Sequence, residues 1–93
     1  MPWTVELFPH AVRDYRRLSA VVRERMRGAL HRLEEYEDPL RGPGVRALVG
    51  RLEGYHRLRV GDLRVIFELI LKRKVIAVHR IVPRKEAYRT PRT

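Results

Sequence analysis

The chain of 93 residues contains no cysteine and no long apolar run. Without cysteine there is no disulfide framework, no thiolate zinc site and no cysteine nucleophile, and a cytoplasmic location is expected. Uninterrupted apolar stretches such as residues 65–67 and 69–71 are only a few residues long. A membrane-spanning helix needs about 20 apolar residues, so no membrane segment is expected. The first residues also lack the basic start and apolar run of a signal peptide.

Groups that usually carry catalysis are equally scarce. Ser19 is the only serine and is better placed to cap a helix than to act in a serine triad. Residues 42–44 (Gly-Pro-Gly) lack the lysine and hydroxyl residue of a phosphate-binding loop. The histidines lack metal-ligand spacing, and the acidic run at residues 34–38 is typical of a solvated helix end. We therefore expect neither a metal site nor a cofactor.

Positive charge is abundant and lies in one half of the chain. The formal net charge is +10. Residues 1–38 contain 7 basic and 7 acidic side chains, whereas residues 39–93 contain 14 basic and 4 acidic ones. Charge that serves only solubility would be dispersed, so this segregation favours a surface that binds a polyanion, most often a nucleic acid. The length predicts a single domain spanning residues 1–93.

The first half of the chain predicts one strand and a helical hairpin. Residues 3–8 alternate apolar and polar side chains, as expected of a strand with one buried face. Pro9 is suited to the first turn of a helix, and Ser19 to the N-cap of a second. The apolar spacing supports a hairpin over about residues 9–36. Gly28 lies inside the second helix, where we expect it to allow close packing on a neighbour.

The second half predicts three strands separated by short turns. Residues 55–60 alternate, residues 63–71 place an apolar side chain at every second position, and residues 75–82 are nearly continuously apolar. The order β-α-α-β-β-β with short hairpins predicts an α+β fold. Its small, mostly antiparallel sheet carries the helical hairpin on one face.

Arginines on these strands are the residues that could bind phosphate. Arg57 and Arg59 share one face of their strand, and Arg64 begins the next strand across a Gly-Asp turn. Arg84 follows the last strand, with Tyr88 four residues further on. Guanidinium groups offer permanently charged, bidentate donors to phosphate, and tyrosine can stack on a base or move a proton. The alternative is that each arginine is simply an exposed charge that protects a sheet edge.

Two segments resemble a known family. Residues 52–67, which read LEGYHRLRVGDLRVIF, and residues 78–88, which read VHRIVPRKEAY, are similar to the RelE/ParE toxin superfamily of type II toxin–antitoxin systems. The likeness extends over nearly the whole chain. It implies an antiparallel sheet cradling a helical hairpin, an antitoxin protein as partner in a toxin–antitoxin hetero-oligomer, and, for RelE-like members, a metal-independent endoribonuclease that cuts mRNA on the ribosome.

The resemblance also assigns roles to residues. In RelE-like members the 2′-hydroxyl attacks the adjacent phosphate while arginines stabilise the phosphorane and an acid/base group moves protons. The implied catalytic residues are Arg64, Arg84 and Tyr88. The implied RNA-binding residues are Arg57, Arg59 and Lys85.

One departure from the family leaves alternatives open. Several RNase members have a histidine directly before the tail arginine, and Pro83 occupies that position here. Either Tyr88 acts as the acid/base group, or catalysis is weak or missing; the presence of Tyr88 favours the RelE-like interpretation. The alternatives are a ParE-like inhibitor of DNA gyrase without nuclease activity and a non-toxic basic RNA-binding module.

Overall fold

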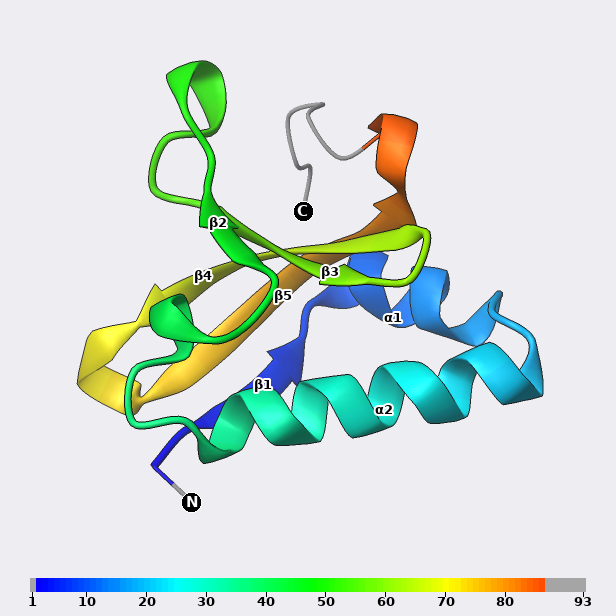
Figure 1. Ribbon diagram of the computed structural model, residues 1–93, viewed down its shortest axis with the longest axis horizontal. Coiled ribbons are helices and arrows are strands. Elements are labelled where there is room, and N and C mark those ends of the chain that lie inside the picture. Colours follow the sequence, from blue (N-terminus) through cyan, green and yellow to red (C-terminus); the bar gives the residue numbers. More distant parts are fainter. Residues whose placement is uncertain (1, 87–93) are drawn as a thin grey trace.

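The computed structural model describes residues 2–86, which form an α+β fold with two helices and five strands. Figure 1 shows the helices together below a twisted sheet. The elements follow in the order β1 (Thr4–Leu7), α1 (Pro9–Arg16), α2 (Ala20–Glu35), β2 (Val45–Ala47), β3 (His56–Val60), β4 (Leu63–Ile70) and β5 (Val75–Pro83). Single 3-10 turns occupy η1 (Pro39–Arg41), η2 (Gly50–Leu52), η3 (Leu71–Arg73) and η4 (Arg84–Glu86).

The two helices begin where the sequence predicts. Pro9 is the first residue of α1. Ser19 caps α2, and its Oγ accepts a hydrogen bond from the Val22 amide at 3.3 Å. Arg23 then ties the helices together, because its Nη1 donates to the carbonyl of Leu18 at 2.9 Å, just beyond the end of α1. The short connection therefore holds α1 and α2 as a hairpin.

The sheet has the order β1-β5-β4-β3-β2. Its pairs are antiparallel except that β1 runs parallel to β5. The expected sheet was therefore correct in class but incomplete in two respects: β2 adds a fifth strand, and β1 makes the sheet mixed. β2 has only three residues, too few for an alternating pattern to stand out in the sequence.

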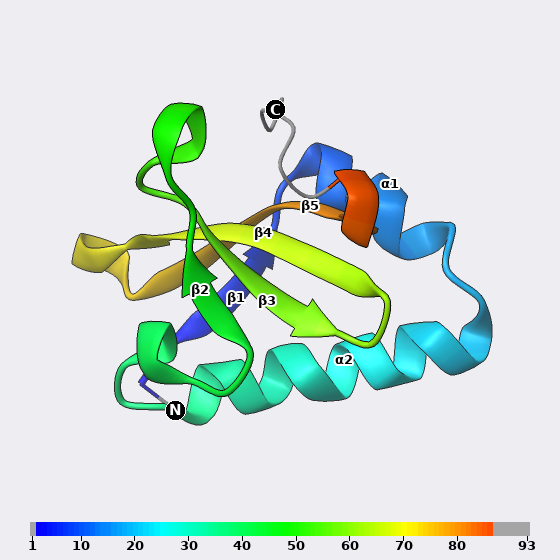
Figure 2. The ribbon, with the colours of Figure 1, turned by 45° about the horizontal axis from the view of Figure 1, so that its top comes forward.

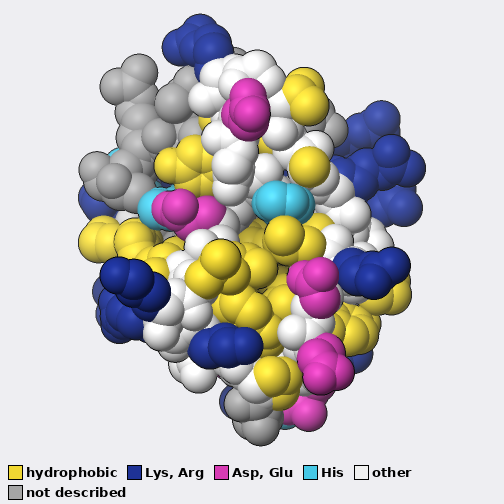
Figure 3. Space-filling model, turned by 90° about the vertical axis from the view of Figure 1, so that its left-hand side faces the viewer, with side chains coloured by type: hydrophobic (Ala, Val, Ile, Leu, Met, Phe, Trp, Pro, Cys, Tyr) yellow, Lys and Arg dark blue, Asp and Glu magenta, His cyan; other side chains and the backbone are white. Residues whose placement is uncertain are grey.

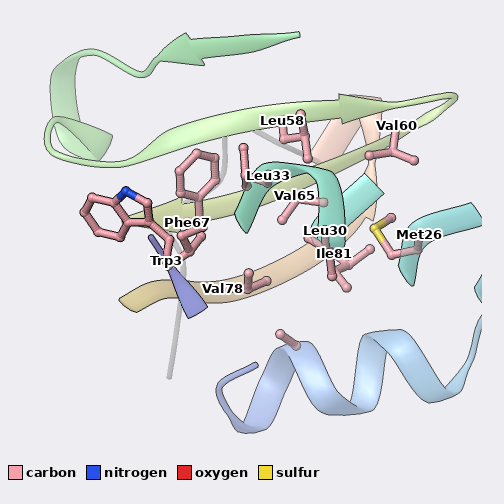
Figure 4. Packing of buried hydrophobic residues seen from close by; sticks show 12 residues of the cluster. Trp3, Met26, Leu30, Leu33, Leu58, Val60, Val65, Phe67, Val78 and Ile81 are labelled. Atoms are coloured by element: carbon pink, nitrogen blue, oxygen red, sulfur yellow. The ribbon is translucent and has the colours of Figure 1, made fainter. Parts of the chain in front are cut away.

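The core lies between the helices and one face of the sheet. Figure 4 shows Leu30 and Leu33 of α2 directed toward Val65 and Phe67 of β4 and Val78 of β5. Val65, Phe67 and Val78 are fully buried. The alternation along β4 predicts this burial for Val65 and Phe67. The alternation fails at its end, because β4 stops at Ile70 and Leu71 lies in η3 with 70% of its surface exposed.

Gly28 does not allow close packing, contrary to the expectation. A side-chain carbon built at this position would meet only the Nη1 atom of Arg32, at 3.5 Å, and that residue belongs to the same helix. Within residues 2–86, no other element comes within 4 Å of that carbon, so Gly28 serves no close packing between the described elements.

Along the edge of β5 that follows Val78, the side chain of Asp14 takes the place of a neighbouring strand. β1 pairs with β5 only as far as Leu7 and Val78. Beyond that point the Asp14 carboxylate of α1 accepts a hydrogen bond from the Ile81 amide at 2.9 Å. The same carboxylate also accepts hydrogen bonds from Arg80, from Nε at 2.8 Å and from Nη2 at 3.2 Å. Asp14 therefore both accepts the hydrogen bond of the Ile81 amide at the edge of β5 and neutralises the charge of Arg80.

A second, smaller apolar cluster lies on the sheet face away from the helices. Leu48 and Leu52, from the connection between β2 and β3, pack with Ile66 and Val82, and Tyr55 joins them. This connection stands up from the sheet in Figure 1. Within the described residues, no α-helix covers this side of the sheet, which is called the open face below. Among residues 2–86, no helix is long and apolar enough to cross a membrane.

Candidate nucleic-acid interface

The strand register places three of the singled-out arginines on the open face of the sheet. Leu58 and Val65 are cross-strand partners on the helix-covered face. Since side chains alternate along a strand, their neighbours Arg57, Arg59 and Arg64 point to the other face. Arg59 lies directly opposite Arg64.

Two further arginines share this face and were not singled out from the sequence. Arg46 of β2 is the cross-strand partner of Arg57, and Arg80 of β5 is the partner of Ile66 on the side opposite Arg57. One row across the sheet therefore reads Arg46, Arg57, Ile66 and Arg80. β2 was not expected as a strand, and a bulge shifts the alternation of β5, so neither residue could be assigned to a face beforehand.

Like charges opposite one another destabilise a sheet, and the arginines of this face find different partners. Nη1 of Arg57 donates to the Gly44 carbonyl at 2.8 Å. Arg64 is only 7% exposed, and its Nη1 donates to the carbonyls of Gly61 and Leu63 at 3.0 and 2.9 Å. These bonds hold the two guanidinium groups in place. Arg59 remains exposed.

Arg84 and Lys85 lie at the same end of the sheet as Arg64. The register pairs Leu63 with Pro83, and the Arg84 amide donates to the Asp62 carbonyl at 3.1 Å. Both basic side chains are exposed and border a hollow of about 580 Å³ together with Asp62 and Pro83. Tyr88, the expected acid/base residue, lies outside the described residues.

A histidine–carboxylate pair on the open face was also missed. His79 Nε2 lies 2.7 Å from Glu68 Oε2, and the ring packs edge-on against Phe8 and Tyr55 at centroid distances of 4.8 and 5.4 Å. Ile66 pairs with Arg80 but Phe67 with Val78, so His79 is the extra residue of a β-bulge. That local shift leaves no signal in the sequence.

The pair does not replace the histidine that several RNase members of the family have directly before the tail arginine. Glu68 follows Arg64 by four residues on β4, which separates their Cα atoms by about 13 Å. A proton-transfer group must come within hydrogen-bond reach of the reacting atom. His79 is 4% exposed, so its ring fills space between aromatic neighbours. In the described part of the chain, no three His, Cys, Asp or Glu residues are grouped to hold a metal ion.

The opposite end of the sheet carries charges of both signs. This end, around η3, faces the viewer in Figure 3, where apolar side chains occupy the middle and acidic groups lie among the basic ones. Arg73 there approaches Glu6, with 3.6 Å between Nη2 and Oε1, and Lys74 lies over the Trp3 ring at 5.1 Å. A surface of mixed sign attracts a polyanion less than one of single sign. The end with Arg64 and Arg84 is therefore the better candidate interface.

No family model and no curated protein matches this chain. Solved structures do match, over most of its length. A toxin–antitoxin complex of the RelBE type from Mycobacterium tuberculosis contains a chain that superposes with a TM-score of 0.77 at 22% identity, covering 90% of this chain and 100% of that one. An archaeal RelE–RelB complex from Pyrococcus horikoshii gives a TM-score of 0.74 at 29% identity, covering 94% of this chain and 100% of the other.

A third similar structure is the YoeB–YefM complex from Staphylococcus aureus, with a TM-score of 0.69 at 18% identity. It covers 86% of this chain and 94% of the matched one. At identities of 18% and 22% the likeness concerns the fold, and the archaeal structure adds a closer sequence similarity. These matches confirm the resemblance expected from residues 52–67 and 78–88. The chain therefore has the fold of these RelE- and YoeB-type toxins and resembles the RelE/ParE toxin superfamily.

Proposed function

We propose that this protein is the toxin of a type II toxin–antitoxin system and that it cuts mRNA on the ribosome as a metal-independent endoribonuclease. The observation that carries the proposal is the convergence of Arg64 and Arg84 at one end of an open, arginine-rich sheet face. The similar structures include RelE–RelB and YoeB–YefM complexes. A RelE-like reading therefore has more support than a ParE-like one.

The proposed reaction breaks the P–O5′ bond of the RNA after attack by the neighbouring 2′-hydroxyl. Arg64 is held by two backbone carbonyls, which fixes its guanidinium before substrate arrives. Preorganised donors of this kind stabilise the charge that develops on the phosphorane. Arg84 would contribute a second positive charge from η4. Tyr88 would accept the 2′-hydroxyl proton, the 2′-oxygen would form a 2′,3′-cyclic phosphate, and the leaving 5′-oxygen would take up a proton from water.

Arg57, Arg59 and Lys85 would hold the RNA backbone. Arg59 and Lys85 are exposed and Arg57 is half-buried. Phosphate contacts position a nucleic acid and make its binding dependent on salt. Replacing these residues should weaken binding more than it slows the chemical step.

The proposed partner is an antitoxin protein that forms a hetero-oligomer with the toxin in the cytoplasm. The relatives found as complexes carry RelB or YefM. A chain with a net charge of +10 would attract an acidic, partly disordered protein that folds on contact. Association should therefore be fast and slow down as salt is added. Co-expression with any short reading frame found beside the gene, followed by co-purification, tests this partner.

Single-turnover cleavage of mRNA on programmed ribosomes tests the enzymatic proposal. The wild type should cut at codon spacing, and Arg64→Ala and Arg84→Ala should each lose about 10²–10³ in rate, as expected when one such donor is removed. Arg41→Ala is a matched control, because Arg41 is exposed in η1, beside the helix-covered face. Thermal melts identify a variant that simply unfolds.

Three outcomes contradict the proposal in different ways. Intact mRNA together with trapped gyrase–DNA complexes would establish the gyrase inhibitor instead. RNA binding without cleavage or toxicity would indicate that the protein is a basic RNA-binding module. Cleavage at the parent rate by Arg64→Ala would remove that arginine from the mechanism.

A further inference from the structure

The tight turn between β3 and β4 is contacted by basic side chains from separate elements. Gly61 in this turn has φ +58°, a left-handed conformation that favours glycine. Its carbonyl accepts the hydrogen bond from Arg64 on the open face. A side-chain carbon built on Gly61 would lie 3.5 Å from Nη1 of Arg25, which belongs to α2 on the other face of the sheet. Two guanidinium groups therefore approach one turn residue.

The overall arrangement makes this turn a meeting point. Figures 1 and 2 both show the β3–β4 turn extending over the middle of α2, with η4 on its other side. The Arg84 amide donates to the Asp62 carbonyl, which places η4 against the turn. The basic residues at the turn come from α2, β3, β4 and η4. They are Arg25, Arg59, Arg64, Arg84 and Lys85.

Within residues 2–86, Arg25 has no carboxylate partner, in contrast to Arg27 and His31 of the same helix. Arg27 pairs with Glu24 at 3.0 Å, and His31 lies 3.4 Å from Glu34. Within residues 2–86, Arg25 forms no ion pair and is exposed. Asp62 is the only acidic side chain in the turn itself. Arg25 therefore adds an uncompensated positive charge where Arg59 and Arg84 are also exposed.

We propose that Arg25 is a further RNA-binding residue, and that the phosphate backbone of the bound RNA strand passes around the β3–β4 turn from the open sheet face toward α2. This inference rests on the proposed function, whose interface covered only the sheet face and η4. Concentrating like charges costs stability, and a bound phosphate chain offsets that cost by accepting the guanidinium donors. The residue pattern of α2 alone does not distinguish Arg25 from the other arginines. Its position near the β3–β4 turn does distinguish it.

The same helix supplies a matched control. Arg32 follows Arg25 by two helical turns, about 10.5 Å along the axis on nearly the same side. It is also exposed and also lacks an ion pair with the described carboxylates. Its guanidinium lies beside Gly28. Replacing either arginine by alanine removes one charge, but of the two only Arg25 lies within 4 Å of a side-chain carbon built on Gly61.

The experiment measures binding of a short single-stranded RNA with 2′-O-methyl riboses, which cannot be cut by 2′-hydroxyl attack. Binding constants are determined over a series of salt concentrations for the wild type, Arg25→Ala, Arg25→Lys, Arg32→Ala and Arg57→Ala. Losing one phosphate contact on a single strand reduces the slope of log K against log salt by roughly 0.7. We expect this reduction for Arg25→Ala and Arg57→Ala, a wild-type slope for Arg32→Ala, and recovery of the slope in Arg25→Lys.

Equal slopes for Arg25→Ala and Arg32→Ala, with a reduced slope for Arg57→Ala, would overturn this inference and leave the proposed function standing. Absence of salt-dependent binding by the wild type would also overturn this inference, and cleavage on programmed ribosomes would still decide the proposed function. Arg25→Ala should melt at the temperature of Arg32→Ala. If Arg25→Ala melts at a lower temperature, the Arg25→Lys variant is used instead. If this variant is stable but its slope of log K against log salt stays below that of the wild type, the inference is also overturned.

Discussion

Asp14 accepts three hydrogen bonds from β5, and replacing it by alanine removes them all. The bonds come from Ile81 N, Arg80 Nε and Arg80 Nη2. Ile81 is 4% exposed, and leaving a buried amide unsatisfied costs about 1–3 kcal/mol. The Asp14 and Arg80 side chains are 10% and 33% exposed, so their pairing lies between a surface ion pair, at about 0–1 kcal/mol, and a buried one. We expect Asp14→Ala to lower the free energy of unfolding by about 3 kcal/mol.

For a domain of this size, 1 kcal/mol corresponds to about 4–8 °C in Tm, so calorimetry should show a decrease of roughly 12–24 °C. Asp14→Asn keeps an oxygen acceptor for the Ile81 amide and should lose less than half as much. Arg13→Ala is the control, because Arg13 is exposed on the same helix and should change stability by less than about 0.5 kcal/mol. If Asp14→Ala melts within a few degrees of the parent, the carboxylate does not hold the β5 edge.

Other predictions concern stability, pH and catalysis. Gly28→Ala should raise the free energy of unfolding by about 1 kcal/mol, because alanine favours a helix interior and the added carbon meets only Arg32 Nη1; a lower Tm would contradict this. Burial lowers the pKa of His56 from 6.5, while Asp38 opposes the shift. The unfolded chain therefore binds more protons than the folded one just below pH 6.5. His56 should contribute to the free energy of unfolding above about pH 6.5. This contribution should be lost as the pH falls from there toward the lower pKa of the folded state. His56→Gln should flatten the dependence between about pH 7 and 5, and equal slopes for both proteins would refute it. Tyr88→Phe should slow single-turnover cleavage by about 10²–10⁴ if the hydroxyl transfers protons, whereas an unchanged rate would leave Tyr88 only a stacking role.

Much of the fold follows from local patterns in the sequence. Pro9 and Ser19 act within one helical turn, and the apolar alternation of residues 63–69 reflects one buried sheet face. Such signals survive in the sequence because the residues involved are close together in the chain. The helix starts and the faces of β4 could therefore be predicted before the structure was known.

Features that depend on distant partners could not be predicted in this way. The bulge at His79 arises from how β5 meets β4, and Arg80 is neutralised by Asp14, which is 66 residues away in the sequence. Arg25 reaches the β3–β4 turn only once α2 is packed below the sheet. Each of these depends on tertiary packing, which overrides the local pattern.

The placement of β5 has a consequence for how the protein is made. β5 lies between β1 and β4 in the sheet, although Thr4 and its partner Val75 are about 70 residues apart in the chain. During synthesis β1 has no strand to pair with, and the apolar side of the helical hairpin stays partly uncovered, until residues 75–83 have been added. Contacts between such distant segments form late in folding. A nascent chain should therefore acquire its arginine-rich face only near the end of translation, and a product that terminates before residue 75 should be unfolded and should lack the proposed activity.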